Sequence, residues 1–122
     1  MKKILVIDDD PGILEALTMI LEGAKYEVDT IVKVSKDINR KLKKNLPDLI
    51  LLDMLLSGSD GREIARRLKA DLKTKHIPII MLSAHPDAEQ AALEAGANNF
   101  IAKPFDMDDL LAKVSKYIGT AD

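Results

Sequence analysis

Residues 4–11 read ILVIDDDP, and this stretch decides the fold. Its four consecutive apolar residues predict a short strand that is buried on both faces, as in a parallel sheet. Asp10 and Pro11 then predict a helix N-cap and a proline in the first helical turn. A buried strand that leads directly into a helix is the repeating unit of an α/β fold.

The rest of the chain repeats this alternation of short apolar runs with amphipathic segments. Further strands are predicted at Glu27–Val32, Leu49–Leu52, Ile77–Leu82 and Asn99–Ala102. Helices are predicted after Pro11, from Ser35 to about Lys44, around Ile64, Ala65, Leu68 and Leu72, at Asp87–Ala95, and at Asp106–Ile118 with Met107, Leu111, Val114 and Ile118 in one buried stripe. Five strands and five helices in alternation predict one parallel sheet with helices on both faces.

Length and composition narrow the class of protein further. The 122 residues fit one domain, which we expect to span residues 1–122. The formal charge of −2 gives no global sign of nucleic-acid or membrane binding, and no stretch approaches the roughly 20 apolar residues of a membrane helix. The chain has no cysteine, which excludes disulfides and thiolate chemistry. We expect a cytoplasmic protein without direct contact to nucleic acid or membrane.

Four of the five predicted strands run into polar residues at their carboxyl ends. These residues are Asp8 and Asp9, Asp53, Ser83 and Lys103. In an open parallel sheet the carboxyl ends of the strands share one edge, where ligands bind at the switch point of strand order, so we expect these side chains to converge. Three carboxylates close together repel one another and favour a bound cation. An all-oxygen set of ligands selects Mg²⁺ or a similar hard ion.

The same residues suggest a reaction. Magnesium takes only one or two carboxylates directly, which leaves one carboxylate as a nucleophile. Aspartate is a known phosphoryl acceptor that forms an aspartyl phosphate. Phosphoryl transfer needs neutralisation of the phosphoryl oxygens, which Lys103 and the metal would supply, while Ser83 would donate a hydrogen bond to the same group.

Over nearly its whole length the sequence resembles the receiver domains of two-component response regulators. The motifs that carry the resemblance are Asp8-Asp9, Leu51-Leu52-Asp53-Met54, Ser83-Ala84, Phe100 and Lys103-Pro104-Phe105. The resemblance implies that Asp53 is the phosphoacceptor, assisted by Lys103 and Ser83, and that Ser83 and Phe100 are switch residues. It implies Mg²⁺ ligands from Asp8, Asp9, Asp53 and the backbone carbonyl of Leu55. Ser57 departs from the family, which usually has proline there.

The resemblance also implies an architecture and partners. It implies a flavodoxin-like, doubly wound sheet with strand order 2-1-3-4-5 and a cis peptide bond at Lys103–Pro104. The function it implies is a phosphorylation-controlled signalling switch, not an enzyme with an external product. The phosphoryl group would come from a histidine kinase, a phosphotransfer protein or a small phosphodonor. A downstream protein or a homodimer partner would bind the surface formed by Asp87–Ala95, Asn99–Ala102 and the exposed side of Asp106–Ile118.

Alternative interpretations remain open at this point. A lone Asp8 would be interpreted as a helix cap, a lone Lys103 as a surface lysine, and Phe100 as a core residue. A phosphate-independent docking module of the same fold is the alternative function. Leu55 stands where many aspartyl-phosphate phosphatases need an acid–base aspartate, which argues against that class of enzyme. The acidic residues after the first strand would repel the phosphate of a flavin cofactor.

Overall fold

A computed structural model describes residues 1–34, 38–56 and 59–120. Five parallel strands form the main sheet in the order β2-β1-β3-β6-β7. Their bounds are β1 Lys3–Ile7, β2 Glu27–Ile31, β3 Leu49–Asp53, β6 Ile79–Ser83 and β7 Asn99–Ala102. Counted in chain order within this sheet, the arrangement is 2-1-3-4-5, so the predicted α/β fold and strand order are confirmed.

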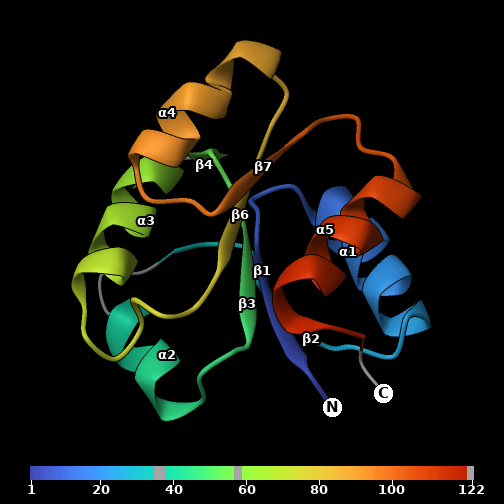
Figure 1. Ribbon diagram of the computed structural model, residues 1–122, viewed down its shortest axis with the longest axis horizontal. Helices are drawn as coiled ribbons and strands as arrows, with labels where there is room; N and C mark the ends of the chain where they lie inside the picture. Colours follow the sequence, from blue (N-terminus) through green and yellow to red (C-terminus); the bar gives the residue numbers. More distant parts are fainter. Residues whose placement is uncertain (35–37, 57–58, 121–122) are drawn as a thin grey trace.

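The helices cover both faces of the sheet. Their bounds are α1 Pro11–Gly23, α2 Ile38–Lys44, α3 Gly61–Ala70, α4 Glu89–Glu94 and α5 Met107–Ile118, with a short 3₁₀ helix η1 at Pro86–Ala88. Helices α1 and α5 pack on one face, and α2, α3 and α4 pack on the other (Figure 1). The result is the three-layer arrangement expected when every strand-to-strand connection contains a helix.

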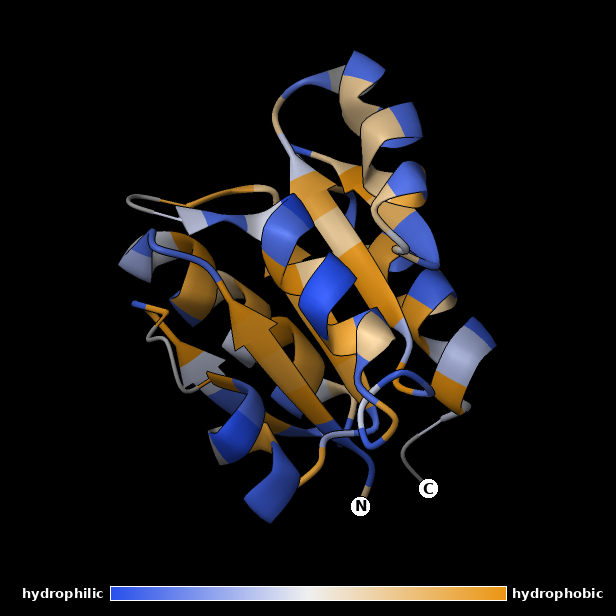
Figure 2. Cartoon of the chain, turned by 90° about the vertical axis from the view of Figure 1, so that its left-hand side faces the viewer, coloured by the Kyte–Doolittle hydropathy of each residue, from blue (hydrophilic) through white to orange (hydrophobic). Residues whose placement is uncertain are grey.

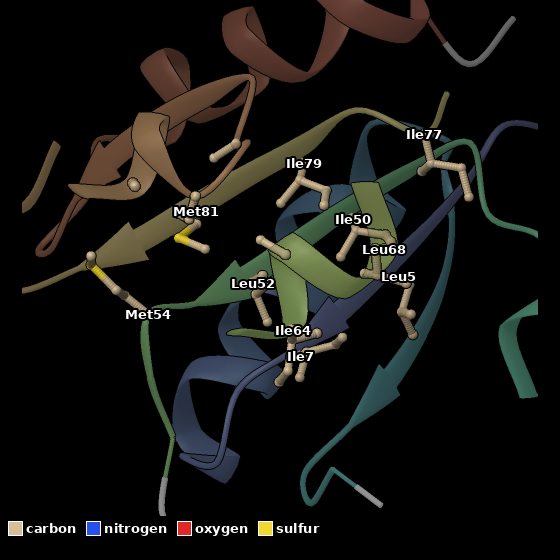
Figure 3. Close-up of a cluster of buried hydrophobic side chains, with 14 of the residues drawn as sticks. Leu5, Ile7, Ile50, Leu52, Met54, Ile64, Leu68, Ile77, Ile79 and Met81 are labelled. Atoms are coloured by element: carbon tan, nitrogen blue, oxygen red, sulfur yellow. The ribbon is translucent and has the colours of Figure 1, made fainter. Parts of the chain in front are cut away.

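Strand β1 shows how the sheet builds two separate cores. Successive side chains of a strand point to opposite faces. Leu5 and Ile7 therefore join the core under α2, α3 and α4, drawn in Figure 3. Ile4 and Val6 join the core under α1 and α5. All five residues of β1 are buried, and Figure 2 shows the strands as largely hydrophobic, with hydrophilic residues gathered on helices and loops.

Aspartates start three of the helices. Asp10, Asp60 and Asp106 each accept a hydrogen bond from a backbone N–H two residues on, at 2.9, 2.9 and 2.8 Å. Such N-caps satisfy backbone donors that have no partner within the helix. The predicted cap at Asp10 is confirmed, whereas the expected cap at Ser35 lies outside the described residues.

The buried stripe predicted for α5 is correct at Val114, wrong at Met107, and omits the buried Leu110. Leu110 and Val114 are fully buried, whereas Met107 is 52% exposed and Leu111 and Ile118 are only partly buried. Both stripes have helical spacing, so periodicity alone does not separate them. Packing against the sheet selects the stripe that contains Leu110.

Several predicted bounds also shift. Helix α3 ends at Ala70, so Leu72 lies beyond it and is 78% exposed. The buried Thr74 hydroxyl donates to Leu68 O at 2.7 Å and closes the chain into a turn there. The strand predicted from Ile77 begins instead at Ile79 and includes Ser83. The helix predicted at Asp87–Ala95 is divided into η1 and α4.

Within the described part of the chain, no helix has both the length and the apolar character needed to span a bilayer.

Candidate functional site

Three carboxylates gather at the switch point of the sheet. Asp8 and Asp9 follow β1, and Asp53 is the last residue of β3, the strand beside β1. One oxygen from each carboxylate lies within 4.8 Å of the others. The chain leaves β1 toward β2 on one side, while β3 lies on the other, so the crevice between β1 and β3 is where a doubly wound sheet binds ligands. The structure thus brings together acidic residues that are 45 positions apart in the sequence.

Lys103, which directly follows the edge strand β7, completes the cluster. Its Nζ lies 3.0 Å from Asp8 Oδ2 and 3.2 Å from Asp53 Oδ1. The backbone holds it there, because Lys103 N donates to Ser83 O at 2.8 Å at the end of β6. The Lys103–Pro104 peptide bond is cis, as the resemblance implied. Asp8, which is fully buried, also accepts the N–H of Asp10 at 3.0 Å through its other oxygen.

The electrostatics of the cluster are unbalanced. Burial raises the pKa of Asp53, Lys103 opposes this shift, and the charges of Asp8 and Asp9 add to it, leaving that pKa above its ordinary value. Burial would lower the pKa of Lys103, but the hydrogen bonds and charges of Asp8 and Asp53 outweigh it and raise that pKa. Lys103 therefore stays charged, and one ammonium group faces three carboxylates.

A hard divalent cation fits this imbalance. The donors are carboxylate oxygens, which Mg²⁺ prefers, and two positive charges would cancel the excess negative charge. The side chain of Leu55 is 57% exposed on β4, Leu55–Leu56, which pairs with β5, Ser59–Asp60, in a small hairpin beside the cluster. Its backbone carbonyl remains the predicted further ligand.

Ser83 and Phe100 lie on neighbouring strands near the cluster. Ser83 is 3% exposed, and its Oγ accepts the N–H of His85 at 3.1 Å, which leaves the hydroxyl hydrogen as a donor. Phe100 is 5% exposed and belongs to the core under α2, α3 and α4. Its side chain is therefore already inside the protein in this structure. Ser57, the departure noted in the sequence, lies outside the described residues.

Gly61 supports the site although none of the sequence motifs above includes it. It is the first residue of α3, and its N–H donates to Met54 O at 2.9 Å. A Cβ on Gly61 would lie far inside the contact distance of Asp53 O and 2.9 Å from Met54 Cα. Helix α3 can approach the end of β3 only because this position has no side chain. The glycine in a polar turn before a helix was the available signal, but the approach to Asp53 depends on the tertiary fold.

The fold and this site define a doubly wound α/β protein with a cluster of carboxylates at its switch point. A family model described as the response regulator receiver domain matches residues 4–115. The chain therefore belongs to the response regulator receiver family, as its motifs indicated.

Curated relatives agree with this assignment. The chain is 42% identical over 115 residues to the phosphate regulon transcriptional regulatory protein PhoB of Pseudomonas aeruginosa, which covers 93% of this chain and 50% of that protein. It is 37% identical over 125 residues to the DNA-binding dual master transcriptional regulator RpaA of Synechocystis, which covers 100% of this chain and 51% of that protein. The chain thus spans about half the length of these relatives.

Solved structures are similar over nearly their full length. The response regulator TrrA of Thermotoga maritima, in complex with Mg²⁺ and BeF, is 33% identical with a TM-score of 0.84, and the match covers 96% of this chain and 99% of that one. The receiver domain of a sensor histidine kinase from Pseudomonas aeruginosa has a magnesium ion coordinated in its active site cleft. It is 28% identical with a TM-score of 0.82, and the match covers 98% of both chains.

Proposed function

We propose that residues 1–122 form a single receiver domain that accepts a phosphoryl group on Asp53 in a Mg²⁺-dependent reaction. The observation that carries this proposal is the placement of Lys103 Nζ within 3.2 Å of Asp53 and 3.0 Å of Asp8, inside a cluster of three carboxylates. A structural ion pair would need one carboxylate for one lysine. The excess of buried negative charge is costly unless a cation binds there.

The proposed ligands of the metal are Asp8, Asp9, Asp53 and the backbone carbonyl of Leu55. When bound, the ion supplies positive charge that offsets the phosphoryl oxygens. Asp9 is more exposed than the buried Asp8, so its carboxylate would be the more accessible of the two to an ion. Asp8 also orients Lys103 through their 3.0 Å contact.

In the proposed step, one carboxylate oxygen of Asp53 attacks the phosphorus atom in line with the departing donor atom. The bond from phosphorus to the donor breaks, and its electron pair leaves with the donor, an imidazole from a phosphohistidine or acetate from acetyl phosphate. Asp53 is then an acyl phosphate. Lys103 transfers one of its ion pairs from Asp53 to a phosphoryl oxygen, and the Ser83 hydroxyl donates to another.

The partners in this proposal are proteins. A histidine kinase or phosphotransfer protein donates the phosphoryl group, and a downstream protein binds the phosphorylated form. The similar proteins that are DNA-binding regulators are about twice as long as this chain. We assign no nucleic-acid contact to residues 1–122, whose formal charge is −2. The chain catalyses only its own phosphorylation and dephosphorylation, so we do not class it as an enzyme.

Incubation with acetyl phosphate and Mg²⁺ tests the proposal. The parent chain should gain one phosphoryl group by intact mass, and hydroxylamine should remove it because acyl phosphates react with this nucleophile. Asp53→Asn should gain none, and omission of Mg²⁺ should prevent labelling of the parent. Equal labelling of Asp53→Asn would refute the assignment of Asp53. An unlabelled parent that still binds Mg²⁺ would favour the phosphate-independent docking module.

A further inference from the structure

We propose that the surface formed by η1, α4, β7 and residues 106–118, called here the α4–β7–α5 face, binds a basic protein segment and not a second copy of this chain. This inference rests on the proposed function, in which a downstream protein binds the phosphorylated form, and it adds the place and the chemistry of that contact. Figure 1 shows α4 and α5 on opposite sides of β7.

A groove of about 520 Å³ lies on this face. Its lining residues come from α4, β7, α5 and the connection between β7 and α5, and are Glu89, Phe100, Ala102, Pro104, Phe105, Asp106, Asp109 and Lys113. Three of them are carboxylates and one is an ammonium group. Ala102 pairs with Ser83 in the sheet, and Lys103 follows it directly. Ala102 of the groove is therefore directly followed in the chain by Lys103, which contacts Asp53.

The face is strongly acidic beyond the groove. The described residues of these elements carry six exposed carboxylates: Asp87, Glu89, Glu94, Asp106, Asp108 and Asp109. Only Lys113 and Lys116 oppose them, a formal balance of −4 on a chain whose total is −2. A surface of one charge attracts partners of the opposite charge and raises their association rate.

Lys113 does little to offset this charge for a partner. Its Nζ donates to Phe100 O at 3.0 Å and lies 3.4 Å from Asp109. The N–H of Phe100 donates to Asn99 Oδ1 at 2.8 Å. Side chains of the protein thus occupy both backbone groups of Phe100 on the edge strand β7. A partner at this point cannot add a strand to the sheet and must be recognised through side chains.

Self-association through this face meets like charges. A two-fold dimer places the same patch on both subunits, so carboxylates would face carboxylates. Opposed like charges disfavour such a contact. The groove lined by Lys43, Arg67 and Lys73 is basic, but Lys43 already pairs with Asp71 at 2.7 Å. Head-to-tail contact between these two grooves would form a ring or an open chain of molecules and no two-fold dimer.

Apolar groups on the same face add a second requirement. Leu93, one turn after the groove residue Glu89 on α4, is 42% exposed, and Pro104 and Phe105 line the groove itself. Apolar groups with a charged rim are the usual anatomy of a protein interface. The partner segment that fits combines Lys or Arg side chains with at least one apolar residue, and nucleic acid, which is an anion, is excluded.

Fluorescence anisotropy with a labelled peptide that alternates Lys and Leu tests the proposal, with beryllofluoride and Mg²⁺ present. We expect saturable binding that weakens as salt is raised from about 0.05 M to about 0.3 M. Glu89→Gln and Asp109→Asn should each weaken binding roughly three- to tenfold. The matched control Glu15→Gln removes an exposed carboxylate from α1 and should leave the affinity unchanged. A peptide with Glu in place of Lys should not bind.

Sedimentation of the same samples tests whether a second copy of the chain binds this face instead of the basic segment. The parent should remain a monomer with beryllofluoride, and a two-fold dimer weakened by Ala102→Arg, or a growing chain of molecules, would overturn the proposal. Equal loss of peptide affinity in Glu15→Gln and Glu89→Gln would also overturn it. Labelling of Asp53 is measured in parallel. Failed labelling with intact peptide binding defeats the proposed function alone, and the reverse result defeats only this inference.

Discussion

At the scale of single residues, Gly61 ties the backbone of the site to helix α3. Its N–H donates to Met54 O, and it leaves no room for a Cβ against the carbonyl of Asp53. The peptide units that carry Asp53 and the loop to Leu55 are therefore held by the first turn of α3. A change at a residue without any side chain should reach the phosphoacceptor through the main chain.

We predict that Gly61→Ala destabilises the fold and slows phosphorylation of Asp53. The new methyl group forces β3 and α3 apart, and overpacking of this kind costs about 1–3 kcal/mol. Urea unfolding and acetyl phosphate labelling measure the two effects. Gly23→Ala is the matched control, because its Cβ would meet nothing within 4 Å. We expect that variant to change stability by no more than about 1 kcal/mol. Equal behaviour of both variants would contradict this role of Gly61.

The sequence was sufficient to predict which residues meet at the site but not how the backbone supports them. Asp8, Asp53 and Lys103 each follow an apolar run, and parallel strands place such ends together. The small hairpin of β4 and β5 and the contact of Gly61 with Asp53 arise only when α3 docks on the sheet. No local pattern encodes a distance between two segments that tertiary packing brings together.

At the scale of elements, two apolar residues near the start of α5 differ in burial. Leu110 is fully buried against the sheet, whereas Met107 lies three residues earlier and is half exposed. Both residues belong to the first turn of α5, so apolar character there does not by itself mean burial. A helical repeat of apolar residues does not distinguish Met107 from Leu110, whereas packing against the sheet does.

We predict that Leu110→Ala lowers the free energy of unfolding by about 2–5 kcal/mol, because it leaves a cavity in a packed core. Met107→Ala should change it by less than about 0.5 kcal/mol, as is usual for surface substitutions. Urea denaturation followed by circular dichroism compares the pair directly. A larger loss from Met107→Ala than from Leu110→Ala would contradict this difference in burial.

Helix α4 should open more readily than its neighbours. Ala92 is its only buried side chain among the described residues, whereas α1 buries Leu14, Leu17 and Leu21. Stabilisation follows buried apolar area, at about 25 cal/mol per Å². We predict that amides at the end of α4 exchange with solvent at least roughly tenfold faster than those in the middle of α1. Equal protection of both helices in native-state hydrogen exchange would show that α4 is held by something other than apolar burial.

At the scale of the whole molecule, Tyr26 links distant parts of the chain. It is 4% exposed after α1, and its hydroxyl donates to Gly119 O at 2.7 Å, beyond the end of α5. Burial raises the pKa of Tyr26 above its ordinary value of 10.0. The neutral phenol is therefore favoured in the folded state. Its contribution to stability is fully present below pH 10 and is lost as the pH rises through the raised value.

We predict that Tyr26→Phe costs about 0.5–1.5 kcal/mol near neutral pH, the net value of one hydrogen bond. The difference from the parent should shrink as the pH rises beyond the ordinary pKa of tyrosine. Subtracting the alkaline absorbance titration of the variant from that of the parent isolates Tyr26. Ionisation of Tyr26 at or below pH 10 in the folded protein would contradict the burial argument.

The hydrogen bonds of Lys113 and Asn99 to the backbone of Phe100 also bear on aggregation at high protein concentration. Strand β7 is one open edge of the sheet, and open edges are templates for the pairing of unrelated chains and for amyloid growth. Proteins often place lysine at such edges to prevent this pairing. Lys113 and Asn99 occupy the carbonyl and the N–H that an incoming strand would need, and Lys113 adds a charge that is costly to desolvate. At Phe100 this edge of the sheet is therefore guarded against pairing with another strand, while its side chains stay open to a partner.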